Sequence, residues 1–211
     1  MAVNPGSGAA PGALIALEGI DGSGKSTQLG RLAVALEGAG RSVVSTFEPT
    51  DGPAGRRLRE LARSTENPSA EEELRLFTED RRQHVDEVLA PALAAGKIAL
   101  TDRYFLSTVA YQGARGLDPR QLLEASEAEF PIPDLVLLFE IAPPLGLERV
   151  SARGVAAEPA FERLDFQQRV AAIFAALDRP YIERIDARPG PDAVHDAVIR
   201  VVGRQLGLSI P

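Results

Sequence analysis

The chain has 211 residues, of which 45% are hydrophobic and 25% charged, a composition typical of one globular domain with a sizeable core. Its formal charge of −7, without a basic block, argues against a nucleic-acid partner, and its apolar runs are too short for a membrane span of ~20 residues. The chain has no cysteine, which excludes disulfides and thiolate metal sites and suits a cytoplasmic protein.

Short apolar runs alternate with longer helical patterns, after a flexible extension expected over residues 1–12, which are rich in Gly, Pro and Ala and lack a signal-peptide pattern. The predicted strands are residues 13–17, 42–47, 97–101, 135–141 and 181–185. The predicted helices are residues 23–37, 55–63, 70–93 (interrupted near its end by Pro91), 105–115, 119–129, 144–153, 161–178 and 192–206. This alternation predicts a single doubly wound α/β domain over residues 13–211, with a five-stranded parallel sheet that binds ligands at the carboxyl ends of its strands.

The clearest motif follows the first predicted strand. Residues 19–26, Gly-Ile-Asp-Gly-Ser-Gly-Lys-Ser, match the phosphate-binding pattern G-x-x-x-x-G-K-[ST], and Lys25 is one of only two lysines among 23 Lys and Arg residues. Glycines let successive N–H groups face phosphate oxygens, and the next helix adds its positive N-terminus. Lys25 is expected to reach the β- and γ-phosphates, and the Ser26 hydroxyl to be a ligand of Mg²⁺. The predicted set for the nucleoside triphosphate is Gly19, Asp21, Gly22, Ser23, Gly24, Lys25, Ser26 and Thr27, although Asp21 fits a plain turn residue equally well and Thr27 fits the first turn of the helix.

Three segments in order make the chain resemble the thymidylate kinase (dTMP kinase) family, of the nucleoside monophosphate kinase group of P-loop kinases. They are the phosphate loop at 17–28, Phe-Thr-Glu-Asp-Arg-Arg-Gln-His at 77–84, and Asp-Arg-Tyr at 102–104 followed by Ser-Thr-Val-Ala-Tyr-Gln-Gly at 107–113. Many NTPases share the first segment, and the other two make the match specific. The resemblance implies a three-layer αβα P-loop kinase fold with a small lid at about residues 149–164. It also implies transfer of the γ-phosphoryl group of ATP to dTMP in dTTP biosynthesis, with Mg²⁺, by a homodimer.

Phe77 and Arg81 are four residues apart, so they share a helix face where a ring and a bidentate donor can hold a base. The resemblance implies that Phe77 stacks on thymine and that Arg81 bonds a ring oxygen. The alternative is a core phenylalanine and a solvated arginine. Asp80 and His84, also four apart, are expected to pair across one turn, with a structural role for His84.

Asp102 follows a predicted strand, where the resemblance implies that it acts on Mg²⁺ directly or through water. Arg103 is then expected to contact the acceptor phosphate, which a planar guanidinium suits, and the alternative is an ion pair between the two residues. By the same resemblance Thr108 and Gln112 border the thymine, and Tyr111 occupies the place of a ribose 2′-OH and so selects deoxyribose. Ordinary helix packing is the alternative for these three.

The acceptor-phosphate end departs from the family pattern. Glu48 is expected to be a site carboxylate, but Phe47 stands where the family often has an arginine. Arg56 or Arg59, on the helix that follows, could supply the missing charge.

The resemblance also concerns the lid. Gly22 stands where one family branch carries an arginine inside the phosphate loop, so the catalytic arginine is expected in the lid. Arg153 is expected to stabilise the transferring phosphoryl group, and Arg149 to lie near the adenine. Arg163 and Arg169 are alternatives for Arg153, and each of these arginines also fits a solvated helix charge.

The predicted catalytic set is Lys25, Asp102, Arg103 and Arg153. A phosphate monoester is already largely dianionic at pH 7, so positioning and charge neutralisation suffice and no general base is expected. Two rivals remain: a kinase for another nucleoside monophosphate or a deoxynucleoside, and a non-catalytic P-loop ATP-binding switch, which leaves the second and third segments unexplained.

Overall fold

The structure, a computed structural model, describes residues 12–64, 68–152 and 164–210. Its five strands form one parallel sheet in the order β2-β3-β1-β4-β5, which confirms the predicted fold class. The strands are β1 (Ala13–Glu18), β2 (Val43–Phe47), β3 (Ile98–Asp102), β4 (Leu135–Glu140) and β5 (Ile182–Asp186). The strand order reverses at β1, so the carboxyl end of β1 is the switch point where such sheets bind ligands.

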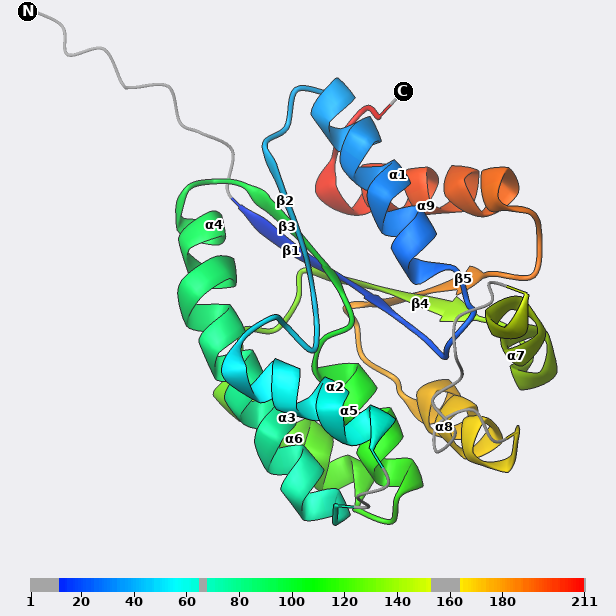
Figure 1. The fold of residues 1–211 in the computed structure, drawn as a ribbon. Coiled ribbons are helices and arrows are strands. Elements are labelled where there is room, and N and C mark those ends of the chain that lie inside the picture. Colours follow the sequence, from blue (N-terminus) through cyan, green and yellow to red (C-terminus); the bar gives the residue numbers. More distant parts are fainter. Residues whose placement is uncertain (1–11, 65–67, 153–163, 211) are drawn as a thin grey trace, which may run out of the picture.

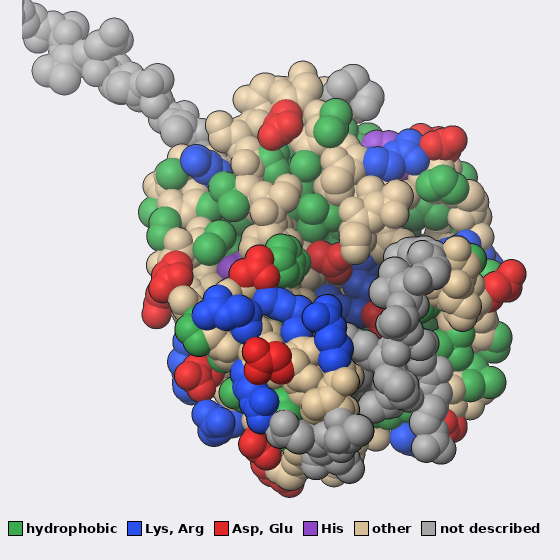
Figure 2. Space-filling view, viewed as in Figure 1, with side chains coloured by type: hydrophobic (Ala, Val, Ile, Leu, Met, Phe, Trp, Pro, Cys, Tyr) green, Lys and Arg blue, Asp and Glu red, His purple; other side chains and the backbone are tan. Residues whose placement is uncertain are grey.

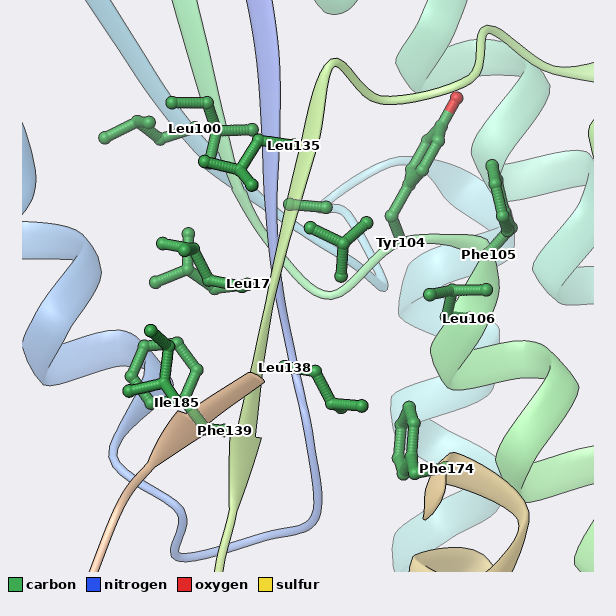
Figure 3. Close-up of a cluster of buried hydrophobic side chains, with 14 of the residues drawn as sticks. Leu17, Leu100, Tyr104, Phe105, Leu106, Leu135, Leu138, Phe139, Phe174 and Ile185 are labelled. Carbon is green, nitrogen blue, oxygen red and sulfur yellow. The ribbon is translucent and has the colours of Figure 1, made fainter. Parts of the chain in front are cut away.

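The central strands are apolar because helices cover both faces of the sheet. Every residue of β1 is buried, and only the last residue of β4 is exposed. Figure 3 shows the alternation along β4, where Leu138 points toward Phe174 while Phe139 points to the opposite face, toward Ile185. The hydrophobic core therefore lies on both sides of the sheet and holds β1 rigidly beneath the loop that follows it.

The helices are α1 (Lys25–Gly38), α2 (Pro53–Arg63), α3 (Ala70–His84), α4 (Ala90–Ala94), α5 (Phe105–Ala114), α6 (Pro119–Glu129), α7 (Pro143–Ser151), α8 (Leu164–Ala176) and α9 (Pro191–Leu206), with a π-helical turn η1 (Val85–Leu89) between α3 and α4. Helices α1 and α9 pack together on one face of the sheet, and α5 packs against α3, α6 and α8 on the other (Figure 1). This is the predicted three-layer αβα arrangement, and most bounds agree with the prediction to within about two residues.

The helix predicted over residues 70–93 breaks earlier than expected. Helix α3 ends at His84, and in η1 the Ala90 N–H donates to the carbonyl of Val85, five residues back. The π turn changes the hydrogen-bond register just before Pro91, which has no N–H and takes a first-turn position of α4. The effect of the proline therefore begins about one turn before the proline itself.

Three predictions fall partly or wholly outside the described residues: the N-terminal extension, the start of the helix at 161–178, and most of the lid, including Arg153 and Arg163. Across the described ranges, no helix is both long and apolar enough to cross a membrane.

Candidate functional site

The loop between β1 and α1 curls tightly at the switch point of the sheet. Gly19, Gly22 and Gly24 have φ angles of +139°, +77° and +96°, which residues with a Cβ avoid. Helix α1 begins at Lys25 and has no side-chain cap, so its first N–H groups remain open to an anion. The helix starts two residues later than predicted because the glycine-rich turn extends to Gly24.

A cavity of about 480 Å³ lies over this loop and the start of α1. Predicted site residues that line it are Asp21, Gly22, Gly24, Lys25, Ser26, Thr27, Glu48, Asp102 and Arg103. Lys25 is buried, and its Nζ donates to the carbonyls of Gly19 and Ile20 at 3.1 and 3.0 Å. Burial, together with the nearby Arg103, lowers the pKa of the Lys25 ammonium to about 8.

The two residues predicted to hold a metal lie side by side. The Ser26 hydroxyl donates to Oδ2 of Asp102, the last residue of β3, whereas Oδ1 of Asp102 is buried and has no hydrogen-bond partner in the part of the chain that the structure describes. Within the same residues, no group of three or more His, Asp or Glu side chains could hold a metal. The chain thus offers one hydroxyl and one carboxylate at the edge of the phosphate loop.

A second cavity, of about 330 Å³, adjoins the first. It brings together Phe77 of α3 with Thr108, Tyr111 and Gln112 of α5, as the sequence predicts for an acceptor pocket. Four residues line both cavities and form what we call the shared wall: Asp21, Phe47, Glu48 and Arg103.

Lys and Arg side chains gather over α2, next to this second cavity (Figure 2). Of the two arginines considered as substitutes for the one missing at Phe47, Arg59 lines the cavity. Its NH1 donates to the carbonyls of Pro49 and Thr50 at 2.8 and 2.7 Å. Arg56 is exposed, and its NH1 donates to a loop carbonyl.

Arg103 lies at the centre of the shared wall. It donates to Oδ1 of Asp21 at 2.5 Å and to Oγ of Ser107 at 3.0 Å, so its ion-pair partner is Asp21 and not Asp102. The Tyr111 hydroxyl donates to Oδ2 of Asp21 at 3.1 Å, and the Arg103 guanidinium lies 5.1 Å from the centroid of the Tyr111 ring. Burial alone would raise the pKa of Asp21. The positive charges of Arg103 and Lys25 and the hydrogen bonds from Tyr111 and Gln167 together outweigh burial and hold that pKa below its usual range.

Arg81 lies behind the wall of the second cavity and is only 1% exposed. Its Nε and NH2 donate to Oε2 of Glu48 at 2.9 and 2.7 Å, and its NH2 also donates to Oγ1 of Thr108 at 2.8 Å. Nδ1 of His84 bonds the other oxygen of Glu48 at 2.9 Å. This buried network rules out the reading of Arg81 as a solvated charge, and a direct bond from Arg81 to a base stays a prediction.

The expected pairing of Asp80 with His84 is wrong. Asp80 accepts hydrogen bonds from the N–H and hydroxyl of Thr50, at 2.8 and 2.6 Å. The two ring nitrogens of His84 bond Glu48 and Thr46. Both side chains face the end of β2 and the segment that follows it, so tertiary partners replace the local contact across one turn.

The sequence reasoning missed two buried carboxylates. Glu18 accepts hydrogen bonds from the N–H of Tyr104 at 2.9 Å and from the N–H and hydroxyl of Ser107 at 3.0 and 2.5 Å, and burial raises its pKa to about 7. The sequence feature that could have revealed Glu18 is its place as a carboxylate at the end of an otherwise apolar strand. Glu73 lines the second cavity and accepts from Nε2 of Gln112 at 3.1 Å. The sequence feature that could have revealed Glu73 is its place one helical turn before Phe77.

Of the remaining predicted arginines, the structure describes Arg149 and Arg169. NH1 and NH2 of Arg149 donate to the carbonyls of Ala187 and Arg188 at 2.8 and 3.1 Å. Arg149 lines a cavity of about 200 Å³ beside the phosphate loop, where Ser23 and Thr27 also lie. Arg169 is exposed on α8.

The chain is similar to known proteins over most of its length. A family model described as thymidylate kinase matches residues 17–198. A thymidylate kinase of Xanthomonas euvesicatoria pv. vesicatoria (strain 85-10) is 51% identical over 183 residues, which cover 87% of this chain and 80% of the relative. A thymidylate kinase of Desulfotalea psychrophila (strain LSv54 / DSM 12343) is 43% identical over 200 residues, which cover 94% of this chain and 98% of the relative. Because the family model and both relatives match most of the chain, the chain belongs to the thymidylate kinase family, the family that its three motifs resemble.

Proposed function

We propose that the protein transfers the γ-phosphoryl group of ATP to dTMP, giving ADP and dTDP, as a step of dTTP biosynthesis. The observation that carries this proposal is the shared wall, where Asp21 and Arg103 line both the cavity over the phosphate loop and the cavity that contains Phe77. A donor phosphate on the loop and an acceptor phosphate at Arg103 would meet there, as direct transfer requires. The kinase domain extends over residues 13–211 in this proposal.

We assign phosphate binding to the open N–H groups at the start of α1 and to Lys25, and the acceptor phosphate to Arg103. The Lys25 ammonium now bonds two loop carbonyls, which the charged oxygens of a phosphate can replace as stronger acceptors. Arg103 is held by Asp21 and Ser107, so its guanidinium is oriented before substrate arrives. The negatively charged oxygens of the donor and acceptor phosphates repel one another. Catalysis then consists of holding the two phosphates together and neutralising their charge, with no covalent intermediate on the protein.

The state of Glu48 favours a phosphate acceptor over a hydroxyl acceptor. A hydroxyl needs a base to take its proton, and Glu48 already accepts two hydrogen bonds from Arg81 and is bonded to His84. A phosphate monoester needs no such base. This argues against a deoxynucleoside kinase, in which a free carboxylate at the acceptor end would be required.

Mg²⁺ fits the pair formed by Ser26 and Asp102. Of the Asp102 oxygens, Oδ2 faces the Ser26 hydroxyl, and Oδ1 is buried without a partner among the described residues. Hydroxyl and carboxylate oxygens are ligands that Mg²⁺ takes, directly or through water, next to substrate phosphates. When bound, the ion neutralises charge on the β- and γ-phosphate oxygens.

For the nucleoside parts we propose that Phe77 stacks on thymine and that Arg81, Thr108 and Gln112 contact or frame its polar edge. Tyr111 occupies the position that a ribose 2′-OH would need. The cavity supports these assignments for the residues that line it, with the Phe77 ring on one helix and polar groups on the facing helix. Arg81 lies behind the cavity wall and donates to Thr108, which lines it. Arg59 provides the charge that is missing at Phe47.

We place the catalytic arginine in the lid, at Arg153, and Arg149 beside the adenine. An arginine inside the phosphate loop is disfavoured, because a Cβ on Gly22 would lie 2.1 Å from the carbonyl oxygen of Gly146. Arg149 lines the small cavity beside the loop, which supports its assignment to the base of ATP.

We further propose a cytoplasmic homodimer without a nucleic-acid partner. The net charge of −7 opposes binding to a polyanionic polymer, and the absence of cysteine suits a reducing compartment. Sedimentation of the purified chain tests the dimer.

An acceptor panel tests the proposed reaction. With MgATP saturating and ADP release coupled to a detection enzyme, kcat/KM should be highest for dTMP among dTMP, dUMP, dCMP, dGMP and thymidine. Turnover of thymidine but not dTMP would establish the deoxynucleoside kinase instead. Slow ATP hydrolysis that no acceptor accelerates would indicate the ATP-binding switch.

The two lysines provide a matched pair of variants. Lys25→Ala should lower kcat by about 10²–10³-fold, because it removes a preorganised charge from the phosphates, while the circular dichroism spectrum stays unchanged. Lys97→Ala, at an exposed position next to β3, should leave kcat unchanged. Near-normal turnover of Lys25→Ala would refute the role of the loop.

A further inference from the structure

Phe47 is an exposed apolar residue at the junction of the two cavities. It is the last residue of β2, and it lines both the cavity over the phosphate loop and the acceptor cavity. It is 46% exposed, and no other aromatic residue is among the exposed large hydrophobic residues of the described ranges. Single exposed hydrophobic residues are ordinary on a protein surface. This one, however, lies where the proposed function places the charged phosphates of both nucleotides.

The strand directs the Phe47 side chain toward the phosphate loop. Side chains alternate along a strand, and Thr46 and Glu48, on either side of Phe47, both bond His84 at 2.9 Å. Phe47 is therefore directed away from His84 and α3. In the register of the sheet its partner on β3 is Asp102, the carboxylate assigned to Mg²⁺. Both residues line the cavity over the loop, so the ring lies on the side of the sheet edge where the phosphates would bind.

Most other residues that line this cavity are polar. Leu29 is the other large apolar residue among the described ones, and three carboxylates, those of Asp21, Glu48 and Asp102, belong to the same lining. Carboxylates and hydroxyls retain water through hydrogen bonds, which the carbon atoms of an aromatic ring cannot do. Water that reaches the γ-phosphorus competes with dTMP. It forms the new P–O bond while the bond to ADP breaks, and the products are ADP, inorganic phosphate and a proton.

We infer that Phe47 is a specificity-determining residue that excludes water from the place where the two phosphates meet, so that the phosphoryl group passes to dTMP and not to water. This inference rests on the proposed function and deepens it. When both nucleotides are bound, they cover the exposed part of the ring, and water leaves its surface. A polar side chain in the same place would keep water beside the reacting phosphorus, whereas the ring keeps it dry.

The test uses the full chain with saturating MgATP and dTMP and measures inorganic phosphate and dTDP in the same sample. In Phe47→Ala, the phosphate released per dTDP formed should rise about tenfold, because water enters the volume that the ring leaves. Phe47→Leu keeps an apolar side chain and should stay within about threefold of the wild-type ratio. Phe47→Gln introduces an amide that binds water, and it should raise the ratio as alanine does. It serves as the second variant if F47A folds poorly.

Two control variants accompany these three. Ile132 is 51% exposed, lies in the segment before β4 and lines neither cavity, so Ile132→Ala should leave the ratio unchanged. In F47A/K25A the excess phosphate should disappear, because it must come from ATP held on the phosphate loop.

A merely structural role for Phe47 would lower both products together and leave their ratio unchanged. That result would overturn the inference. So would a ratio in F47L as high as in F47A, or excess phosphate that persists in F47A/K25A. A wild-type chain that forms no dTDP from dTMP would instead refute the proposed function.

Discussion

Arg103 combines the central position of the site with a strained backbone. Its φ of +74° is the single positive value among the non-glycine residues described, a conformation that costs about 1–2 kcal/mol. Glu18 supports it from two directions, since its carboxylate accepts the N–H of the next residue, Tyr104, and the hydroxyl of Ser107. Ser107 in turn accepts from NH1 of Arg103. One buried carboxylate therefore holds both the backbone and the guanidinium of the arginine assigned to the acceptor phosphate.

Glu18 should also make stability depend on pH. Burial raises its pKa from 4.5 to about 7, so between these values the folded state keeps a proton that the unfolded state has lost. This contribution is fully present below about pH 4.5, and the free energy of unfolding falls as pH rises through 7. Relative to Glu18→Gln, the wild-type chain should lose ~2 kcal/mol of stability between pH 5 and pH 8, measured by urea unfolding. A difference that stays constant with pH would contradict the raised pKa.

At the scale of elements, helix α7 packs directly onto the phosphate loop. A Cβ on Gly146 of α7 would lie 2.6 Å from the carbonyl oxygen of Asp21, so the two backbones meet without room for a methyl group. Gly146 is helical, and alanine would suit its backbone conformation, so a substitution there reports on the contact alone. Because α7 leads toward the predicted lid, this contact joins the loop to the part of the chain expected to cover ATP.

Gly146→Ala should therefore disturb the donor site. Overpacking at such a contact costs about 1–3 kcal/mol, and KM for ATP should rise several-fold while KM for dTMP changes less. Gly30→Ala on α1 is the control, because nothing lies within 4 Å of its added Cβ, and it should stabilise the chain by about 0.5–1 kcal/mol. If Gly146→Ala neither lowers thermal stability nor raises KM for ATP relative to Gly30→Ala, α7 does not brace the loop.

The elements and the phosphate loop could be predicted because their signals are local in sequence. Buried parallel strands appear as apolar runs, and the loop carries its glycines, lysine and serine within eight residues. The contacts that set the polarity of the site are not local. Glu48 meets His84 and Glu73 meets Gln112 across 36 and 39 positions, and only the packing of α3 against β2 and α5 brings them together. Pattern and resemblance therefore pointed to Gln112 but not to Glu73, the carboxylate that accepts its hydrogen bond.

At the scale of the whole molecule, a protein with a net negative charge has a candidate site for two negatively charged nucleotides. The charge of −7 is a sum over the whole chain, whereas the site collects Lys25, Arg103, Arg59 and the start of α1 around two adjoining cavities. Both nucleotides would bring their phosphates to the shared wall, so each should repel the other unless the charge between them is neutralised. Binding of the two substrates should therefore be coupled, with a sign that depends on Mg²⁺.

Calorimetric titration can measure this coupling. Without Mg²⁺, the non-transferring analogue AMP-PNP should weaken dTMP binding by about tenfold, which corresponds to ~1.4 kcal/mol of repulsion. With Mg²⁺ the weakening should disappear, because the ion offsets the charge of the triphosphate beside Ser26 and Asp102. Adenosine, which has no phosphates, is the control and should leave the Kd for dTMP unchanged in both conditions. Equal Kd values for dTMP with and without AMP-PNP in the absence of Mg²⁺ would mean that the two phosphate sites are too far apart for the shared wall to serve direct transfer.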